Sequence, residues 1–271
     1  MIESAVTIAL VPQIQKGPWI FWYDLKKSME KSAQLGFDAI ELFTEDARAI
    51  SPEKLQNLLS QYGLKLAAVG TGAGKVVHGW TLTHPDASIR SKSLEFISEM
   101  MEFGASFNAP AIIGSMQGSF TTGIEEKQTM DWLSSGLKQL NELAGNLRTK
   151  LIYEPLNRYE TNLINTLGKA AAYLDEHELT NTRLLADLFH MNIEETNLSD
   201  CISEHISHIG HVHFADSNRN PAGYGHTNFE PIASALKNGG YSGFVSAEAF
   251  PWPDPDLAAE QTIRTFNKYF K

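Results

Sequence analysis

Four titratable side chains in the second half of the sequence stand at or near the ends of short apolar runs. Glu154 ends the run KLIYE, Asp187 ends RLLAD and Glu248 ends GFVSAE. The run HIGHVHF carries His211 and His213, which would share one face of a strand because side chains alternate. Carboxylates that gather beside an imidazole repel one another unless a cation neutralises them. These residue types are therefore typical of a metal site.

The donor types narrow the kind of ion. Three carboxylates and one imidazole form an oxygen-rich set, which suits Mn²⁺, Mg²⁺ or Co²⁺ better than a metal that prefers thiolates. We predict one divalent ion held by Glu154, Asp187, His213 and Glu248. Each residue alone has a simpler interpretation, because a carboxylate at a strand end often caps the next helix and a histidine in a strand is often a hydrogen-bonded core residue. The coincidence of all four carries the prediction.

The elements that must position these residues alternate along the chain. Short runs rich in Val, Ile and Leu are separated by longer segments of helical pattern, which indicates repeated strand-plus-helix units. The eight runs are residues 4–10, 38–43, 65–69, 109–114, 150–154, 183–187, 208–214 and 243–248. Between them, Ser51 and Pro52 predict one helix start, Asp254 and Pro255 predict another, and Gly239 predicts a helix end.

Eight such units predict an α/β fold. Strands too apolar to face water imply a parallel sheet covered by helices, and eight units in about 270 residues most simply close into a barrel. A doubly wound sheet is the alternative, but it usually starts with a glycine-rich phosphate turn, and the first turn here, VPQIQKGPWIFWYDL, has no G-x-G-x-x-G. We predict a single (β/α)8 TIM-barrel domain over residues 1–271, with function at the C-terminal ends of the strands.

Charge and cysteine content exclude several classes of protein. The 271 residues include 22 Lys and Arg against 32 Asp and Glu, a net charge of -10. Proteins that bind duplexes present a basic face, so we expect neither a nucleic-acid nor a membrane partner. The single cysteine, Cys201, excludes an internal disulfide and a cysteine-based zinc site. Glu3 stands where a signal peptide would be basic, and no long uncharged run appears, so we expect a cytoplasmic protein.

The motifs around the candidate ligands resemble a known family. They are EPLNRYE at 154–160, DLFH at 187–190, HVHFADSNR at 211–219 and AEAF around Glu248. The chain resembles the xylose-isomerase-like barrels of the sugar (phosphate) isomerases and epimerases, and within them the D-tagatose/D-psicose (ketose) 3-epimerase group. The motifs match in order and spacing over the second half of the chain, whereas the first half matches in its barrel rhythm and in HPD at 84–86.

The resemblance implies an enzyme of carbohydrate metabolism. It also implies a role for each matched residue in the active site. Glu154, Asp187, His213 and Glu248 would be the ligands of a metal ion, with Mn²⁺ the expected one, and Glu154 and Glu248 would also be the acid/base pair. His190 and Arg219 would hold the carbonyl end of a small sugar, and Glu160 would orient its neighbours.

The expected chemistry gives these roles a physical reason. A proton next to a ketone is weakly acidic, so a divalent ion must stabilise the cis-enediolate formed when the proton leaves. Inversion of a carbon requires a base on each face. Glu154 and Glu248 lie three strands apart in a ring of eight, so they can flank a substrate. This disposition favours a ketose 3-epimerase over a 1,2-isomerase, which needs one base.

Further residues after the predicted strands are candidates for substrate contact. Ser115 follows the fourth run and Trp252 the eighth, and each has a simpler interpretation as part of an ordinary turn or loop. Glu41, at the end of the second run, could contact substrate or cap a helix. Aromatic side chains in the first loop, such as Trp19, could wall the substrate, cover the first helix or pack a neighbouring subunit. These aromatic side chains, together with the oligomers that the resembling enzymes form, lead us to expect a homo-oligomer, a dimer or tetramer.

Several other functions fit parts of the pattern. A lyase resembling the inosose dehydratases would use the same ion and enediolate but expel a hydroxyl. A 1,2-aldose–ketose isomerase or a hydroxypyruvate isomerase would need one base, and a binding protein would need none. Endonuclease IV-like DNA-repair enzymes share the barrel but need a D-R-H motif before an I-G-x-G turn. Here the stretch is SNRNPAGYG, with Ser217 and Arg219 in place of the acid and the histidine, and the acidic chain argues against DNA.

Overall fold

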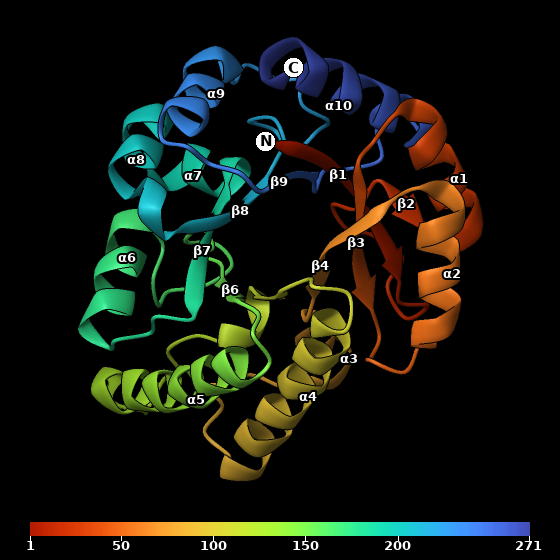
Figure 1. Ribbon diagram of the computed structural model, residues 1–271. Helices are drawn as coiled ribbons and strands as arrows, with labels where there is room; N and C mark the ends of the chain where they lie inside the picture. Colours follow the sequence, from red (N-terminus) through yellow and green to blue (C-terminus); the bar gives the residue numbers. More distant parts are fainter.

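The alternating pattern folds into a closed parallel barrel surrounded by helices, viewed along its axis in Figure 1. This computed structural model describes residues 1–271. The strands are β1 (Glu3–Leu10), β2 (Phe21–Trp22), β3 (Ala39–Thr44), β4 (Lys65–Gly70), β5 (Ala111–Ile113), β6 (Leu151–Tyr153), β7 (Thr182–Asp187), β8 (Ile209–His213) and β9 (Phe244–Ala247). Every pairing is parallel, and β9 pairs with β1 to close the barrel, which confirms the predicted (β/α)8 architecture.

The helices lie outside the strands. They are α1 (Leu25–Leu35), α2 (Pro52–Tyr62), α3 (Ala73–His78), α4 (Ala87–Ala105), α5 (Glu126–Asn146), α6 (Leu167–Glu176), α7 (Leu188–Glu194), α8 (Leu198–His205), α9 (Phe229–Asn238) and α10 (Pro255–Phe270). The predicted signals act as expected: Ser51 caps α2, Asp254 caps α10 and Gly239 ends α9. No helix combines the length and the apolar character needed to cross a membrane.

Apolar packing fills the space between strands and helices and also the lower part of the barrel. Toward the N-terminal end of the strands, the interior is closed by a small cluster of Ala5, Ala39 and Ala67 with Phe244. A second cluster consists of Ala68, Ile112, Ile152 and Leu185. Two residues further along the same strand faces come Glu154 after Ile152 and Asp187 after Leu185. The barrel therefore changes from an apolar floor to a polar mouth.

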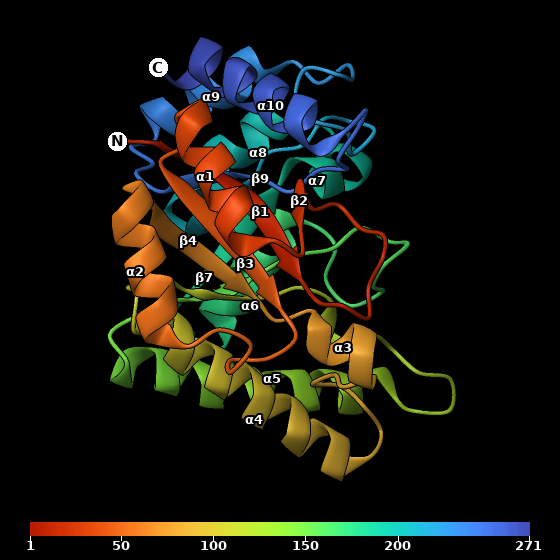
Figure 2. The ribbon, with the colours of Figure 1, turned by 90° about the vertical axis from the view of Figure 1, so that its right-hand side faces the viewer.

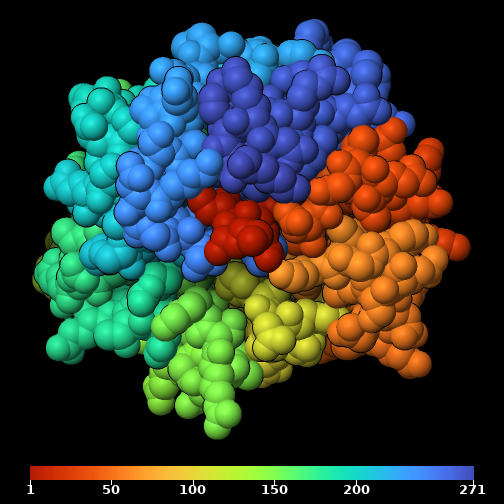
Figure 3. All heavy atoms as spheres, turned by 45° about the horizontal axis from the view of Figure 1, so that its top comes forward, coloured from red at the N-terminus to blue at the C-terminus, as the bar shows by residue number.

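The two ends of the barrel differ accordingly. In Figure 2 the strands run from the end that holds the N-terminus toward the end that holds α3 and the long loops. Figure 3 shows the first of these ends, with the N-terminal residues at the centre of the face and the other segments around them. The mouth with its loops is the end at which the candidate residues were expected.

Short β2 was not among the predicted runs, and it shapes the mouth. Strand β1 pairs with β9 along Glu3 to Val6, and beyond that point Ile8 and Ala9 pair with Phe21 and Trp22 of β2. This pairing holds the first loop, which includes Trp19, against the end of the barrel.

Neighbouring strands keep a regular register except at two places. Between β3 and β4, Ile40 pairs with Leu66 but Glu41 pairs with Ala68, so β4 carries one additional residue. Between β7 and β8, Leu184 pairs with Ile209 but Leu185 pairs with His211, so β8 carries one as well. Both irregularities are β-bulges, which redirect side chains.

Candidate active site

A cavity of about 190 Å³ opens at the mouth of the barrel. Its walls are formed by polar side chains together with some aromatic ones. Among the residues predicted from the sequence, Ser115, Glu154, Glu160, His190, His213, Arg219 and Glu248 line it. Asp187 lies just beneath the cavity surface and is 1% exposed. The structure therefore brings eight of the predicted residues to one place.

The four predicted ligands converge on a common centre. One donor atom from each of Glu154, Asp187, His213 and Glu248 lies within 4.8 Å of all the others. His213 Nδ1 is 3.3 Å from Asp187 Oδ2, and 3.6 Å from both Glu154 Oε1 and Glu248 Oε2. Ligands bound at about 2.1 Å to one ion lie roughly 3 to 4 Å apart, so these spacings fit a single ion.

Asp187 caps a helix and also turns an oxygen toward the cluster. Its Oδ1 accepts hydrogen bonds from the backbone N–H groups of Phe189 and His190, at 2.7 and 3.1 Å, which caps helix α7. Its Oδ2 faces His213 Nδ1. One oxygen holds the helix, and the other is available as a ligand.

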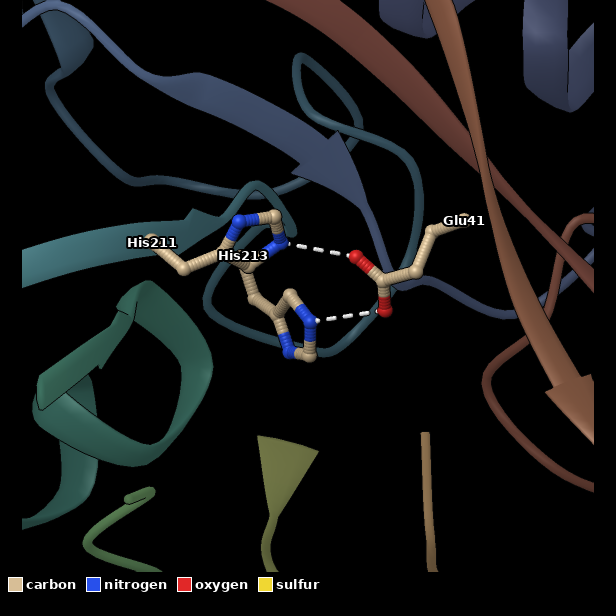
Figure 4. A group of neighbouring side chains, drawn as sticks. All are labelled: Glu41, His211 and His213. Carbon is tan, nitrogen blue, oxygen red and sulfur yellow. Dashed lines mark hydrogen bonds and ion pairs between the residues drawn. The ribbon is translucent and has the colours of Figure 1, made fainter. Parts of the chain in front are cut away.

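Glu41 lies beneath the cluster and holds two histidines (Figure 4). One carboxylate oxygen is 2.7 Å from His211 Nε2, and the other is 3.1 Å from His213 Nε2. Burial raises the pKa of Glu41, but the two imidazoles outweigh burial and hold the pKa well below its usual range. An ionised carboxylate only accepts, so both Nε2 atoms donate. Because Glu41 holds Nε2, His213 turns Nδ1 toward the cluster, where its lone pair would bind an ion that displaces the Nδ1 proton, as in a carboxylate–histidine–metal arrangement.

This role for Glu41 was not foreseen from the sequence, which suggested a substrate contact or a helix cap. The available signal was an acidic residue inside AIELFT, a run that is otherwise apolar and fully buried. A buried charge needs partners, and His211 was the unexplained polar residue on the facing side.

The electrostatics of the cluster favour positive charge. Burial raises the pKa of Glu248 to about 7, against the lowering effects of His213 and Arg219, and the neighbouring Glu154 and Asp187 raise it further. Burial lowers the pKa of His213, but Glu41 and Glu248 raise it well above its usual value. Crowded carboxylates with few cations are the setting in which a divalent ion binds well.

Arg219 bridges two of the acidic residues at the cavity wall. Its Nη2 donates to Glu248 Oε2 at 2.9 Å and its Nη1 to Glu160 Oε1 at 3.1 Å, while the guanidinium lies over the Phe189 ring at 4.8 Å. The loop that presents Arg219 is held by Asp216, whose carboxylate accepts backbone hydrogen bonds from residues 217, 223 and 227. Glu160 thus orients Arg219.

The wall opposite Arg219 depends on close backbone packing near Glu154. A Cβ on Gly114 would overlap Glu154 Oε2, so any larger residue would displace the Glu154 carboxylate. Buried Gln117 donates from Nε2 to the carbonyl oxygens of Gly114 and Glu154, both at 2.9 Å, and accepts from the Tyr153 hydroxyl at 2.6 Å. Gln117 therefore fixes the end of β6.

The aromatic side of the cavity differs from the expectation. Trp252 is 52% exposed in the loop after β9, and it packs edge-on against Tyr224 instead of lining the cavity. The loop turns away because the Phe250 N–H binds the Arg219 carbonyl oxygen. Trp19 lines the cavity instead, stacked on Phe43 with ring centroids 4.3 Å apart.

Comparisons with known proteins agree with this architecture. The sequence model of the xylose isomerase-like TIM barrel family matches residues 29–269. D-psicose 3-epimerase of Ruminiclostridium cellulolyticum is 29% identical over 236 residues, which are 84% of this chain and 78% of that protein. The 3-dehydro-D-guloside 4-epimerase of Escherichia coli is 37% identical over 116 residues, 43% of this chain and 44% of that protein. A crystal structure of D-psicose 3-epimerase with D-tagatose, from Clostridium cellulolyticum, aligns with a TM-score of 0.81 at 22% identity and covers 99% of both chains.

Proposed function

This chain belongs to the xylose isomerase-like TIM barrel family, and we propose that it is a ketose 3-epimerase that depends on one divalent metal ion. The family resemblance predicted from the motifs is confirmed. The relatives named above are epimerases, and the chain is an enzyme of the isomerase class that acts on sugars. The reacting carbon, the ion and the role of each residue are the content of the proposal.

The observation that carries the proposal is the placement of two carboxylates around one cavity. Glu154 follows β6 and Glu248 follows β9, with β7 and β8 between them. Each has an oxygen 3.6 Å from His213 Nδ1, and both line the cavity. Epimerisation removes a proton from one face of a carbon and returns a proton to the other. A pair of bases reaching the substrate from different strands supports that reaction.

The donor set supports a hard divalent ion. Glu154, Asp187, His213 and Glu248 would hold it, with Mn²⁺ the expected ion and Mg²⁺ or Co²⁺ as alternatives. When bound, such an ion supplies a Lewis acid that stabilises negative charge on a substrate oxygen. Glu41 would hold Nε2 of His213, so that Nδ1 is the nitrogen turned toward the ion.

The chain's own residues would move the protons. Glu248 lines the cavity and is ion-paired with Arg219, and it would exchange a proton with one face of C3. Glu154 would take the complementary role at the other face of C3.

Two buried nitrogen atoms in the site lack protein partners. His190 Nε2 and Arg219 Nε are buried with no hydrogen-bonding atom in reach. Buried donors are normally satisfied, so we propose that oxygens of the substrate satisfy these two. On an oxygen that gains negative charge, one aimed donor is worth about 3 kcal/mol.

A second candidate is 4-epimerisation of a 3-keto glycoside. The stretch of 37% identity to the E. coli 3-dehydro-D-guloside 4-epimerase favours it. The chemistry is the same, since the inverted carbon is again next to a ketone, and the two candidates differ in the position of that ketone, C2 of a ketose or C3 of the glycoside.

Proton NMR in D₂O separates these reactions. The protein is loaded with Mn²⁺, freed of excess ion, and incubated with a panel of free ketoses and one 3-keto glycoside. Deuterium at C3 of a ketose, with growth of the epimer, is the expected result. Deuterium at C4 of the glycoside would replace it with the second candidate, exchange at C1 with aldose formation would indicate a 1,2-isomerase, and loss of water would indicate a dehydratase. Protein treated with chelator is the control for the ion.

Exposed aromatic side chains near the mouth support the proposal of a homo-oligomer. Tyr159 is 82% exposed, Trp252 52% and Phe250 41%, which is unusual for large apolar groups outside an interface. Light scattering after size exclusion tests it, and a monomer at micromolar concentration would contradict it.

A further inference from the structure

His190 presents its two ring nitrogens to different surroundings. Nδ1 lies 2.7 Å from the side-chain amide nitrogen of Asn157. Nε2 is buried without a partner, and the carboxylate oxygens of Glu154 and Asp187 nearest to it are both 3.7 Å away, beyond hydrogen-bond length. Which nitrogen carries the proton decides whether His190 offers the cavity a donor or an acceptor.

The orientation of the Asn157 amide is fixed by its other partners. Its Oδ1 lies 2.9 Å from the backbone nitrogen of Tyr159, which can only donate. Its Nδ2 lies 3.3 Å from Glu160 Oε1, an oxygen that also accepts from Arg219. Reversing the amide would set a donor against the Tyr159 N–H and an acceptor against the carboxylate. The nitrogen therefore faces His190.

We infer that Asn157 is a positioning residue that keeps Nδ1 of His190 bare and its proton on Nε2. An amide nitrogen only donates, so Nδ1 must accept and carries no proton. A proton on Nδ1 would face the amide's own N–H. The remaining proton is then on Nε2, which is the nitrogen that lacks a protein partner in the cavity wall.

The consequence for the substrate deepens the proposed function and rests on it. A ketone oxygen only accepts, so it requires the donor form of His190. His213 has the opposite orientation, because its Nε2 faces Glu41 and its Nδ1 faces the carboxylates, 3.3 Å from Asp187 Oδ2. His190 thus offers the cavity its Nε2 proton, whereas His213 would offer an ion its Nδ1, and in each case a neighbouring side chain holds the other ring nitrogen. His190 in this form cannot accept the proton of C3.

Nitrogen NMR tests the inference without any substrate. Long-range ¹H–¹⁵N spectra of the labelled protein, with diamagnetic Mg²⁺ in place of Mn²⁺, distinguish protonated from bare ring nitrogens, and His190→Gln assigns the signals. We expect His190 to show a bare Nδ1 and a protonated Nε2. Asn157→Asp keeps the size of the side chain but places only acceptors beside Nδ1, so we expect the proton to move to Nδ1. A protonated Nδ1 in the unsubstituted protein, or an unchanged pattern in Asn157→Asp, would overturn the inference.

Asn165→Ala is the matched control for loop structure. Asn165 lies in the same loop and donates to the carbonyl oxygens of Leu156 and Thr161, at 2.8 and 2.9 Å, without touching His190. We expect it to leave the His190 signals unchanged.

Activity adds an independent readout. Loss of the aimed donor predicts a fall in kcat/KM of about 10²-fold in Asn157→Asp, and a smaller fall in Asn157→Ala, in which His190 can take either form. Asn157→Asp also sets a carboxylate against Glu160 Oε1, so the fall in kcat/KM is attributed to the lost donor only where the spectra show that the proton has left Nε2. If the NMR pattern holds and no sugar reacts, the proposed function fails while the inference about Asn157 stands.

Discussion

Glu41→Gln probes the part of the site that lies deepest in the barrel. The substitution keeps the side-chain shape but leaves one acceptor oxygen where there are now two, each within 3.1 Å of an imidazole nitrogen. The amide oxygen can serve one histidine, and the NH₂ group then faces the Nε2 of the other. When that other residue is His213, its proton must move to Nδ1, the atom that faces Glu154, Asp187 and Glu248.

The expected loss follows from that displaced proton. Removing a group that orients a metal ligand typically weakens metal binding by 10- to 100-fold. At an ion concentration of about 100 times the unsubstituted Kd, binding stabilises the fold by about 2.7 kcal/mol. A 30-fold weaker variant at the same concentration keeps about 0.9 kcal/mol. With a shift of about 2 °C per kcal/mol for a chain of this size, the rise in Tm on adding metal falls from about 5 to about 2 °C.

Calorimetric titration with Mn²⁺ gives the Kd, and thermal melts with and without chelator give the change in Tm. Glu45→Gln is the matched control, because it removes the same charge one residue beyond β3, where the carboxylate makes only a surface contact with Gln13. The control should bind Mn²⁺ like the unsubstituted protein. A folded Glu41→Gln variant with an unchanged Kd and an unchanged metal-dependent rise in Tm would refute the orienting role.

Three further substitutions test other parts of the site. Glu248→Gln should abolish deuterium exchange into the substrate while Mn²⁺ still binds weakly, and full exchange activity would exclude Glu248 as a base. Gly114→Ala should displace the Glu154 carboxylate and remove most of kcat/KM at little cost in stability, measured by steady-state kinetics and urea unfolding; a wild-type kcat/KM would show that the position of this carboxylate is not critical. Burial raises the pKa of Asp216, but hydrogen bonds from the backbone N–H groups of Thr227, Ser217 and Gly223 outweigh burial and lower the pKa below its usual value. The contribution of ionised Asp216 to the free energy of unfolding is therefore present above the unfolded pKa of about 4 and is lost as the pH falls below it. Asp216→Asn should therefore cost about 1–3 kcal/mol at pH 7 and less at pH 3, and a pH-independent difference in urea unfolding would contradict this assignment.

Features that depend on residues close in sequence were predictable. The apolar runs and the caps at Ser51 and Asp254 are local signals, and they located the barrel strands to within a few residues. The four candidate ligands could be found for the same reason, since each ends or nearly ends a run whose C-terminal end must lie at the mouth.

Features that depend on tertiary contacts were not predictable. Glu41 and His211 are 170 positions apart, and nothing near either residue indicates its partner. Gln117 acts on backbone atoms of Gly114 and Glu154, which any residue type would supply. Strand β2 has two residues, too few to form a pattern. Trp252 was placed in the cavity because its loop follows a strand, but the direction of that loop is set by a backbone bond to Arg219.

The extra residue in β8 bears on how this barrel can evolve. Ile209 packs in the large cluster between strands and helices together with Val212, three positions later, although residues three apart on a regular strand point to opposite faces. Gly210, the additional residue, restores the alternation of side chains between the two faces of the strand, so that His211 and His213 point inward. A descendant that loses this single residue can retain the apolar anchor on the outer face or the two inward histidines, but not both. A deletion at this position would therefore disturb the site more than most substitutions around it.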